Sequence, residues 1–180
     1  MKKKINNKIL NMLQREKKIK FTLEDPKYKS LLFNRFINRI MKNGKKSNSI
    51  KMIMFSFKLL KRKYYKTPIN IFKKVIKNLQ PHMLVKTYNM AGKPFIIPVF
   101  LNSRNSIRVV FGWLKLSINK IYEKYKNNFS IKMFYEFDSL LNYFNKNKNN
   151  IIETESIKLK KKNQQLILEN KKNMHYRWKK

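Results

Sequence analysis

The sequence predicts a mainly α-helical protein, with about six helices and one β-hairpin between the third and the fourth helix. Apolar residues recur three or four positions apart over most of the chain, which is the spacing of helices with one buried face. Residues 84–90 and 95–101 instead have the pattern of two strands around a turn at residues 91–94. Because an isolated hairpin is marginally stable in water, these strands need a helical body or a partner to pack on.

The first two helices are predicted by their apolar stripes and by the residues between them. The first stripe covers residues 32–41, and Gly44 ends this helix because glycine readily adopts the left-handed cap conformation. Ser47 or Ser49 is expected to cap the second helix, because a serine hydroxyl can accept from the free amides of the first turn. The apolar stripe of this second helix covers residues 50–64.

The other helices have starts and ends of the same kind. Thr67 followed by Pro68 predicts the start of the third helix, and Pro81 predicts its end. Ser130 is expected to cap the fifth helix. The three helices after the hairpin are predicted over residues 103–126, 130–144 and 154–171.

The charge of the chain predicts a polyanionic partner. The 180 residues include 44 Lys and Arg but only 9 Asp and Glu, so the formal net charge is +35. Repulsion among these positive charges destabilises the compact state unless a polyanion neutralises the charge. The apolar share of 42% is nevertheless sufficient for a core. Because Phe and Tyr alternate with runs of Lys, RNA is the first choice of polyanion.

The residue inventory argues against an enzyme, a metal site and a cofactor. The chain has no Cys, which excludes thiolate zinc sites and Cys nucleophiles, and its two His, His82 and His175, are far apart. The few acids are scattered, and Glu136 and Asp138 point in different directions if they share a helix. A two-metal nuclease needs carboxylates that converge, which this inventory does not provide.

Two other function classes stay as alternatives. A membrane-surface protein would use basic amphipathic helices without a shared core, although the longest apolar run, at 95–101, is too short to span a bilayer. An organellar nucleic-acid enzyme, such as a homing endonuclease, would need the missing carboxylate cluster. In contrast to these two alternatives, a phosphate-binding loop at Gly44 is excluded, because Arg39 stands where that motif needs its first Gly.

A series of short motifs resembles a known protein family. In chain order, the motifs are Asp25-Pro26-Lys27-Tyr28, the block Phe36–Ser47, Asn78-Leu79-Gln80-Pro81, Val85-Lys86, Pro98-Val99, Trp113 and the closing His175-Tyr176-Arg177-Trp178. Over roughly residues 22–178, this order resembles the small-subunit ribosomal protein seven family in its bacterial and organellar form. The long block and the closing motif are specific when they occur together.

The resemblance implies a structural, non-catalytic protein of the ribosome. The implied fold is a helical bundle with a protruding hairpin, and the implied role is to bind the 3′ major domain of small-subunit rRNA and to organise assembly of the head. The implied neighbours are other head proteins, with mRNA and exit-site tRNA near the hairpin, and no membrane. We expect a basic extension at 1–24, one rRNA-binding helical domain at 25–172 with the hairpin at about 84–101, and a tail at 173–180.

Basic and aromatic residues of these segments are the candidate RNA contacts. They are Lys2, Lys3, Lys4, Lys45, Lys46, Lys86, Tyr88, Lys93, Arg104, Arg108, Lys160, Lys161, Lys162, Tyr176, Arg177 and Trp178. Tyr88 and Asn89 stand where the family has two Arg, so this hairpin is expected to bind RNA less specifically. For residues 176–178, RNA contact and packing on the body stay open as alternatives, whereas Trp113 is expected in the core.

The amino-acid usage predicts an A/T-rich genome. Lys is far more frequent than Arg, Asn and Ile abound, and Ala91 is the only Ala. This bias and the Lys/Asn-rich stretch at 145–150 favour a mitochondrial ribosome. A plastid, or the cytoplasm of a reduced A/T-rich bacterium, is the alternative.

Overall fold

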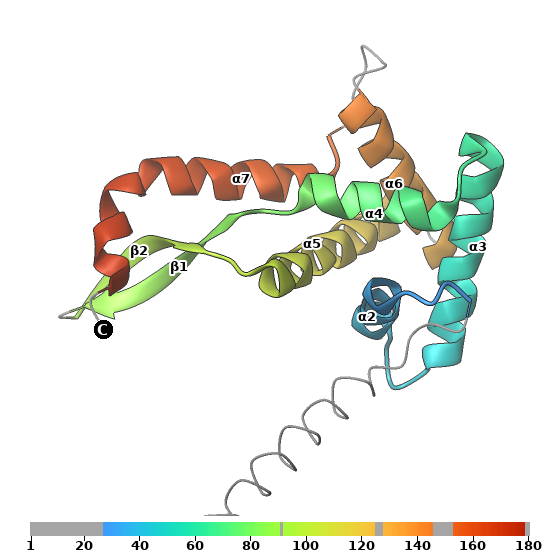
Figure 1. Ribbon diagram of the computed structural model, residues 1–180, viewed down its shortest axis with the longest axis horizontal. Helices are drawn as coiled ribbons and strands as arrows, with labels where there is room; N and C mark the ends of the chain where they lie inside the picture. Colours follow the sequence, from blue (N-terminus) through green and yellow to red (C-terminus); the bar gives the residue numbers. More distant parts are fainter. Residues whose placement is uncertain (1–26, 91, 125–127, 146–152, 179–180) are drawn as a thin grey trace, which may run out of the picture.

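A computed structural model describes residues 27–90, 92–124, 128–145 and 153–178 (Figure 1). Within these ranges it contains six α-helices, one antiparallel hairpin and a 3-10 helix. The prediction of a mainly helical fold with a hairpin between the third and fourth helices is confirmed. In chain order the elements are α2 (Leu31–Ile40), α3 (Lys46–Tyr64), α4 (Pro68–Leu79), β1 (Met83–Met90), β2 (Lys93–Phe100), α5 (Ser103–Lys124), α6 (Phe129–Asn145), α7 (Glu155–Glu169) and η1 (Lys171–Trp178).

The start of α4 is confirmed, whereas the predicted cap of α3 is wrong. Thr67 is the N-cap of α4 and Pro68 occupies its first turn. In contrast, α3 begins at Lys46, before both candidate serines, and its N-cap is Lys45. Ser49 lies in the first turn instead, where its hydroxyl donates to the carbonyl of Lys45 at 3.3 Å. The predicted role of Gly44 as the cap of the first helix is also wrong, because α2 ends at Ile40 and its C-cap is Met41. Gly44, at φ 69°, instead completes the reversal two residues before α3, so the chain enters α3 early.

The predicted cap of α6 is also wrong. This helix begins at Phe129, and the carbonyl of Asn128 accepts the first backbone hydrogen bonds from Ile131 and Lys132. Ser130 is therefore inside the helix. Its carbonyl accepts a hydrogen bond of 2.6 Å from the buried hydroxyl of Ser56 on α3, so it joins two helices.

The turn of the hairpin is shorter than the sequence predicted. Met90 pairs with Lys93, so only residues 91 and 92 connect the strands, and Lys93 and Pro94 belong to β2. Gly92 has φ 75°, the left-handed conformation that two-residue hairpin turns require. Lys93 and Pro94 have the composition of turn residues, which is why the sequence predicted a four-residue turn.

Aromatic rings from five helices form the core. Phe72 of α4 is fully buried at its centre, and its ring lies 5.0 Å from that of Phe36 and within 6.4 Å of those of Phe33, Phe57, Phe111 and Phe137. Trp113 is buried, as expected. Periodic Phe residues on separate helices thus meet at one point, which accounts for a stable body despite the high charge.

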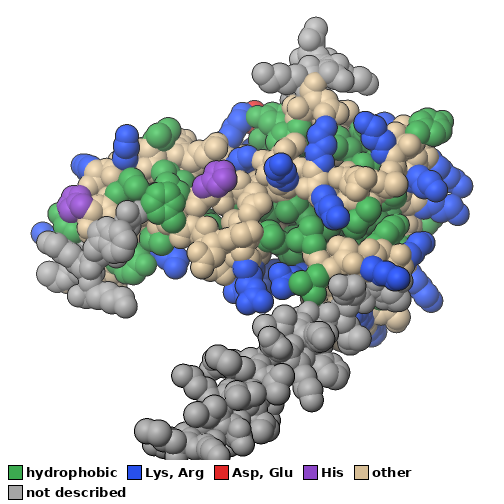
Figure 2. Space-filling view, in the orientation of Figure 1, with side chains coloured by type: hydrophobic (Ala, Val, Ile, Leu, Met, Phe, Trp, Pro, Cys, Tyr) green, Lys and Arg blue, Asp and Glu red, His purple; other side chains and the backbone are tan. Residues whose placement is uncertain are grey.

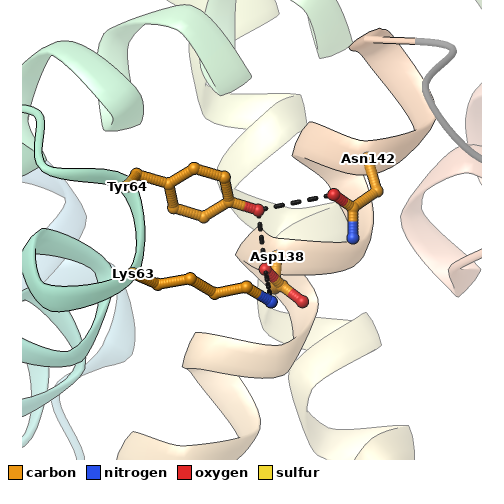
Figure 3. A network of polar contacts seen from close by, with 4 residues as sticks. All are labelled: Lys63, Tyr64, Asp138 and Asn142. Carbon is orange, nitrogen blue, oxygen red and sulfur yellow. Dashed lines mark hydrogen bonds and ion pairs between the residues drawn. The ribbon is translucent and has the colours of Figure 1, made fainter.

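A polar network joins α3 to α6 (Figure 3). The hydroxyl of Tyr64 donates to Oδ1 of Asp138 at 2.6 Å, and Nζ of Lys63 lies 2.6 Å from the same oxygen. Burial raises the pKa of Tyr64, and the bond to Asp138 raises it further. Asp138 is therefore engaged in holding two helices together.

Glu136 faces a different set of elements from Asp138. Its side chain is fully buried, and one carboxyl oxygen accepts a hydrogen bond from the hydroxyl of Ser156 on α7. Burial raises the pKa of Glu136 above its ordinary value of 4.5. The two acids serve separate helix contacts, as their spacing in the sequence predicted.

Replacing Glu136 by Gln is expected to stabilise the protein at neutral pH by about 1 kcal/mol, the scale of one buried polar group. The folded-state pKa is raised, so the wild-type protein loses stability as pH rises from about 4.5 through that pKa. Glutamine removes this loss of stability, so the free energies of unfolding of the two proteins should converge below pH 4.5. Urea unfolding at pH 4 and pH 7 measures the difference, and lower stability of Glu136→Gln at pH 7 would contradict the prediction. Asp138→Asn, which weakens the contacts with Lys63 and Tyr64, should be destabilised at pH 7.

The hairpin and α7 form an arm beside the helical body (Figure 1). Nδ2 of Asn163 on α7 donates to the carbonyl of Met83 at 3.0 Å. The 3-10 helix η1 turns back against β2, where the ring of Tyr176 lies 5.7 Å from that of Phe95. The hairpin thus has the helical support that an isolated two-stranded sheet would need.

Candidate nucleic-acid interface

Four arginines surround one groove between α2 and α5. Each helix contributes a pair four positions apart, which lies on one helix face. The groove has a volume of about 450 Å³ and is lined by Arg35, Asn38, Arg39, Arg104, Ile107, Arg108 and Phe111. We call it the arginine groove. It contains four of the seven arginines in the sequence, and no described carboxylate lines it.

A hydrogen bond joins α2 to α5 beside this groove. Nζ of Lys115 on α5 donates to the carbonyl of Arg39 at 3.0 Å, at the C-terminal end of α2, where a cation complements the helix dipole. The guanidinium of Arg39 lies beside Gly112, since a Cβ built at this position would be 3.8 Å from it, an ordinary van der Waals distance. The four arginines thus lie on two packed helices. The planar guanidinium of an arginine can donate two parallel hydrogen bonds to the oxygens of one phosphate group.

The sequence predicted only half of this groove. Arg104 and Arg108 were candidate contacts, and both are exposed. Arg35 and Arg39 were missed, although their spacing places them on the polar face of α2. The packing of α2 on α5 brings the two pairs together, and no spacing within one segment could reveal that packing.

Three of the described acids form ion pairs with lysines outside the groove. Asp138 pairs with Lys63, Glu153 pairs with Lys161, and Nζ of Lys120 lies 2.5 Å from Glu155. Figure 2 accordingly shows Lys and Arg side chains over the body and the arm, with Asp and Glu barely visible on that face. The remaining positive charge is available for phosphate neutralisation.

Lys45 and Lys46 stand at the start of α3. Lys45 is exposed and is the N-cap residue, and α3 has no acidic residue in its first turn. The positive charges of these two lysines lie beside the positive end of the helix dipole, which is an unfavourable electrostatic arrangement. An anion such as phosphate would relieve this repulsion.

The hairpin candidates share one face of the sheet. In the register of the strands, Lys86 lies opposite Ile97 and Tyr88 opposite Phe95, while Lys93 pairs with Met90. All three candidate side chains, those of Lys86, Tyr88 and Lys93, are exposed. One aromatic ring between two cations suits a nucleotide, which offers a base to stack and a phosphate to neutralise.

The run of lysines on α7 has three different environments. Lys160 is half-buried and donates to the carbonyl of Asn78 at the end of α4, and burial lowers its pKa. Lys161 pairs with Glu153, and this hydrogen bond raises its pKa. Lys162 is exposed. The run is therefore partly a helix support, with Lys162 the member most available to a ligand.

The terminal candidates are only partly described. Lys2, Lys3 and Lys4 lie outside the described residues, as do the side chains of Arg177 and Trp178. The ring of Tyr176 packs against that of Phe95, and RNA contact by Tyr176 stays a prediction. The described ranges also contain no group of three His, Cys, Asp or Glu that could hold a metal ion, and no helix long and apolar enough to cross a membrane.

Comparison with known proteins identifies the family. A family model described as Ribosomal protein S7p/S5e matches residues 12–164. The small ribosomal subunit protein uS7 of Mycoplasma capricolum subsp. capricolum is 32% identical over 156 residues, covering 87% of this chain and 93% of that protein. Proteins of the same name from Mesoplasma florum and Rickettsia massiliae are each 31% identical, covering 87% and 57% of this chain and 93% and 64% of those proteins. The chain therefore belongs to the Ribosomal protein S7p/S5e family, a structural and non-enzymatic family of the small ribosomal subunit that serves translation.

Proposed function

We propose that this protein binds the 3′ major domain of small-subunit rRNA and organises assembly of the head of the subunit. The observation that carries the proposal is the arginine groove, which four arginines line and no described carboxylate lines. Arginine forks match the geometry of phosphate oxygens, so a groove of this kind suits an RNA backbone. The choice of the 3′ major domain rests on the family to which the chain belongs.

Lysines outside the groove extend the proposed interface. Lys45, Lys46 and Lys162 would neutralise further phosphates, and Lys2, Lys3 and Lys4 stay predicted contacts of the N-terminal extension. Double-stranded RNA is recognised mainly by shape and backbone, because its deep major groove is closed to side chains. A rigid body with fixed cations meets this requirement without base-specific contacts.

The hairpin arm is the part proposed to lie near the mRNA exit path and exit-site tRNA. Tyr88, Lys86 and Lys93 offer one ring and two charges, which can stack on a base and neutralise phosphates without reading sequence. Neighbouring head proteins complete the proposed surroundings. Arg177 and Trp178 remain proposed contacts at the end of the chain.

Salt-dependent binding tests this proposal. The purified protein is titrated with the 3′ major domain of small-subunit rRNA, with an unrelated RNA of equal length and with anionic vesicles. About six to ten phosphate contacts would lower the affinity by roughly 10³–10⁵ between 50 mM and 200 mM salt. Selective rRNA binding that survives moderate salt supports the proposal. Equal binding to all three partners, lost together as salt rises, would contradict the proposal. The positive charge would then attract polyanions in general.

A mitochondrial ribosome is the proposed location, with a plastid or an A/T-rich bacterial cytoplasm as the alternative. The scarcity of Ala and the excess of Lys over Arg support an A/T-rich genome. Fractionation of the source cell followed by sedimentation tests the location. Recovery of the protein in the small subunits of purified mitochondria is expected. Recovery only in plastid small subunits, or in the small subunits of a bacterial source cell, would favour the corresponding alternative.

A further inference from the structure

The two outer edges of the hairpin carry different backbone groups. In an antiparallel pair, alternate residues bond across the ladder and those between them point outward. The closing pair Met90 and Lys93 and the 3.0 Å bond from the amide of Leu101 to the carbonyl of His82 have the same register, so they define the bonded positions. The outward positions are Val85, Thr87 and Asn89 on β1 and Pro94, Ile96 and Pro98 on β2.

The outer edge of β2 is closed to another strand. Pro94 and Pro98 have no amide hydrogen to donate. The carbonyl of Ile96 between them already accepts a 3.1 Å hydrogen bond from Nδ2 of Asn173, and η1 packs along this strand. Both devices are known means of preventing strand addition at a sheet edge.

The outer edge of β1 is open toward the tip. At its base, the carbonyl of Met83 is bonded to Asn163 of α7. Beyond that point, no described residue bonds the outward amides or carbonyls of Thr87 and Asn89, whose side chains are exposed. This part of β1 therefore presents a donor and an acceptor at every second residue, at the spacing of an extended chain.

We propose that the outer edge of β1 at Thr87 and Asn89 binds an extended, acidic segment of a neighbouring ribosomal protein by strand addition. The inference rests on the proposed place of the protein in a ribonucleoprotein. A peptide backbone matches alternating donors and acceptors, whereas phosphate oxygens only accept and would leave the carbonyls unmatched. The segment is expected to be acidic because residues 83–100 contain Lys86 and Lys93 but no acid.

Amide exchange in the full-length protein tests the inference. Exchange at Thr87 and Asn89 is measured in the free protein, in its complex with the 3′ major domain of rRNA, and in the small subunit assembled with its complete set of proteins. We expect exchange to slow at least about tenfold only in the assembled subunit. Unchanged exchange there would overturn the inference, as would protection by rRNA alone. The rRNA complex is an independent arm, so failure of the proposed RNA binding would be recognised by the absence of that complex.

A proline variant provides a second readout. Thr87→Pro removes an outward amide and leaves the ladder intact, as Pro94 and Pro98 do in β2. Its retention in assembled subunits should fall about fivefold, the effect of one lost hydrogen bond, while binding to rRNA alone stays at the wild-type level. Thr87→Val keeps the amide and is the matched control. Equal retention of the Pro and Val variants would contradict the proposal, and the wild-type exchange data decide if Thr87→Pro does not fold.

Discussion

Replacing the four arginines of the arginine groove by Gln is expected to weaken binding to the 3′ major domain of rRNA about a thousandfold at moderate salt. Each charge-assisted hydrogen bond to phosphate contributes roughly 1.5–3 kcal/mol, and neighbouring contacts do not add fully. The slope of log affinity against log salt should fall by about 3, since roughly 0.7–0.9 counterions are released for each phosphate neutralised. Filter binding over a salt series measures both quantities.

A control with the same loss of charge separates the groove from the net charge. Four exposed cations of α3 serve this purpose when they are replaced together by Gln: Lys51, Lys58, Lys61 and Arg62. This variant keeps the groove, so it should lose about tenfold in affinity at most, through weaker long-range attraction. Equal losses in the two variants would show that the groove has no special role.

Arg39→Lys separates the fork from the charge within the groove. Lysine keeps the positive charge but binds as a single point, so the salt slope should stay unchanged while affinity falls about fivefold. The carbonyl of Arg39 remains available to Lys115, so the contact between α2 and α5 is preserved. An affinity equal to that of the wild-type protein would mean that a simple cation is sufficient there.

The helical fold was predictable because its determinants are local. Thr67 and Pro68 specify a helix start within two residues, and apolar spacing shows which face of each helix is buried. The caps of α3 and α6 were not predictable in this way, because several polar residues precede each helix and backbone geometry selects among them. The closing turn was missed because Pro94 looks like a turn residue, and only the register shows that its missing amide points outward.

The candidate interface was less predictable than the fold, because it depends on contacts between distant segments. Arg35 and Arg39 meet Arg104 and Arg108 only through the packing of α2 on α5. Conversely, adjacent lysines of one run have different partners, since Lys160 caps α4 while Lys161 pairs with an acid. A run of charge therefore predicts the kind of partner, and tertiary contacts decide which charges are available to it.

Replacing Phe72 by Ala is expected to lower the free energy of unfolding by about 3–5 kcal/mol, the range for a buried Phe. Its ring is fully buried and contacts rings from α2, α3, α5 and α6, so truncation leaves a cavity that several helices would have to fill. Typical domains are stable by about 5–15 kcal/mol, so this loss is a large share of the total. Urea unfolding followed by circular dichroism in moderate salt measures it.

Phe55→Ala is the matched control, because the side chain of Phe55 on α3 is 51% exposed. This substitution should change the free energy of unfolding by no more than about 0.5 kcal/mol, as most surface substitutions do. If the two Ala variants unfold at the same urea concentration, the ring cluster around Phe72 does not form the stabilising core.

Addition of rRNA separates loss of folding from loss of binding. A ligand that binds only the folded protein stabilises it by about 2.7 kcal/mol at one hundred times its dissociation constant. The 3′ major domain should therefore restore much of the folded population of Phe72→Ala, because this variant keeps its arginine groove. The variant with Gln at the four arginines of the groove is expected to be folded without RNA and to gain no such stabilisation from it. Because self-repulsion at a net charge of +35 opposes folding, the gain for Phe72→Ala should be largest at low salt, where RNA relieves the repulsion most.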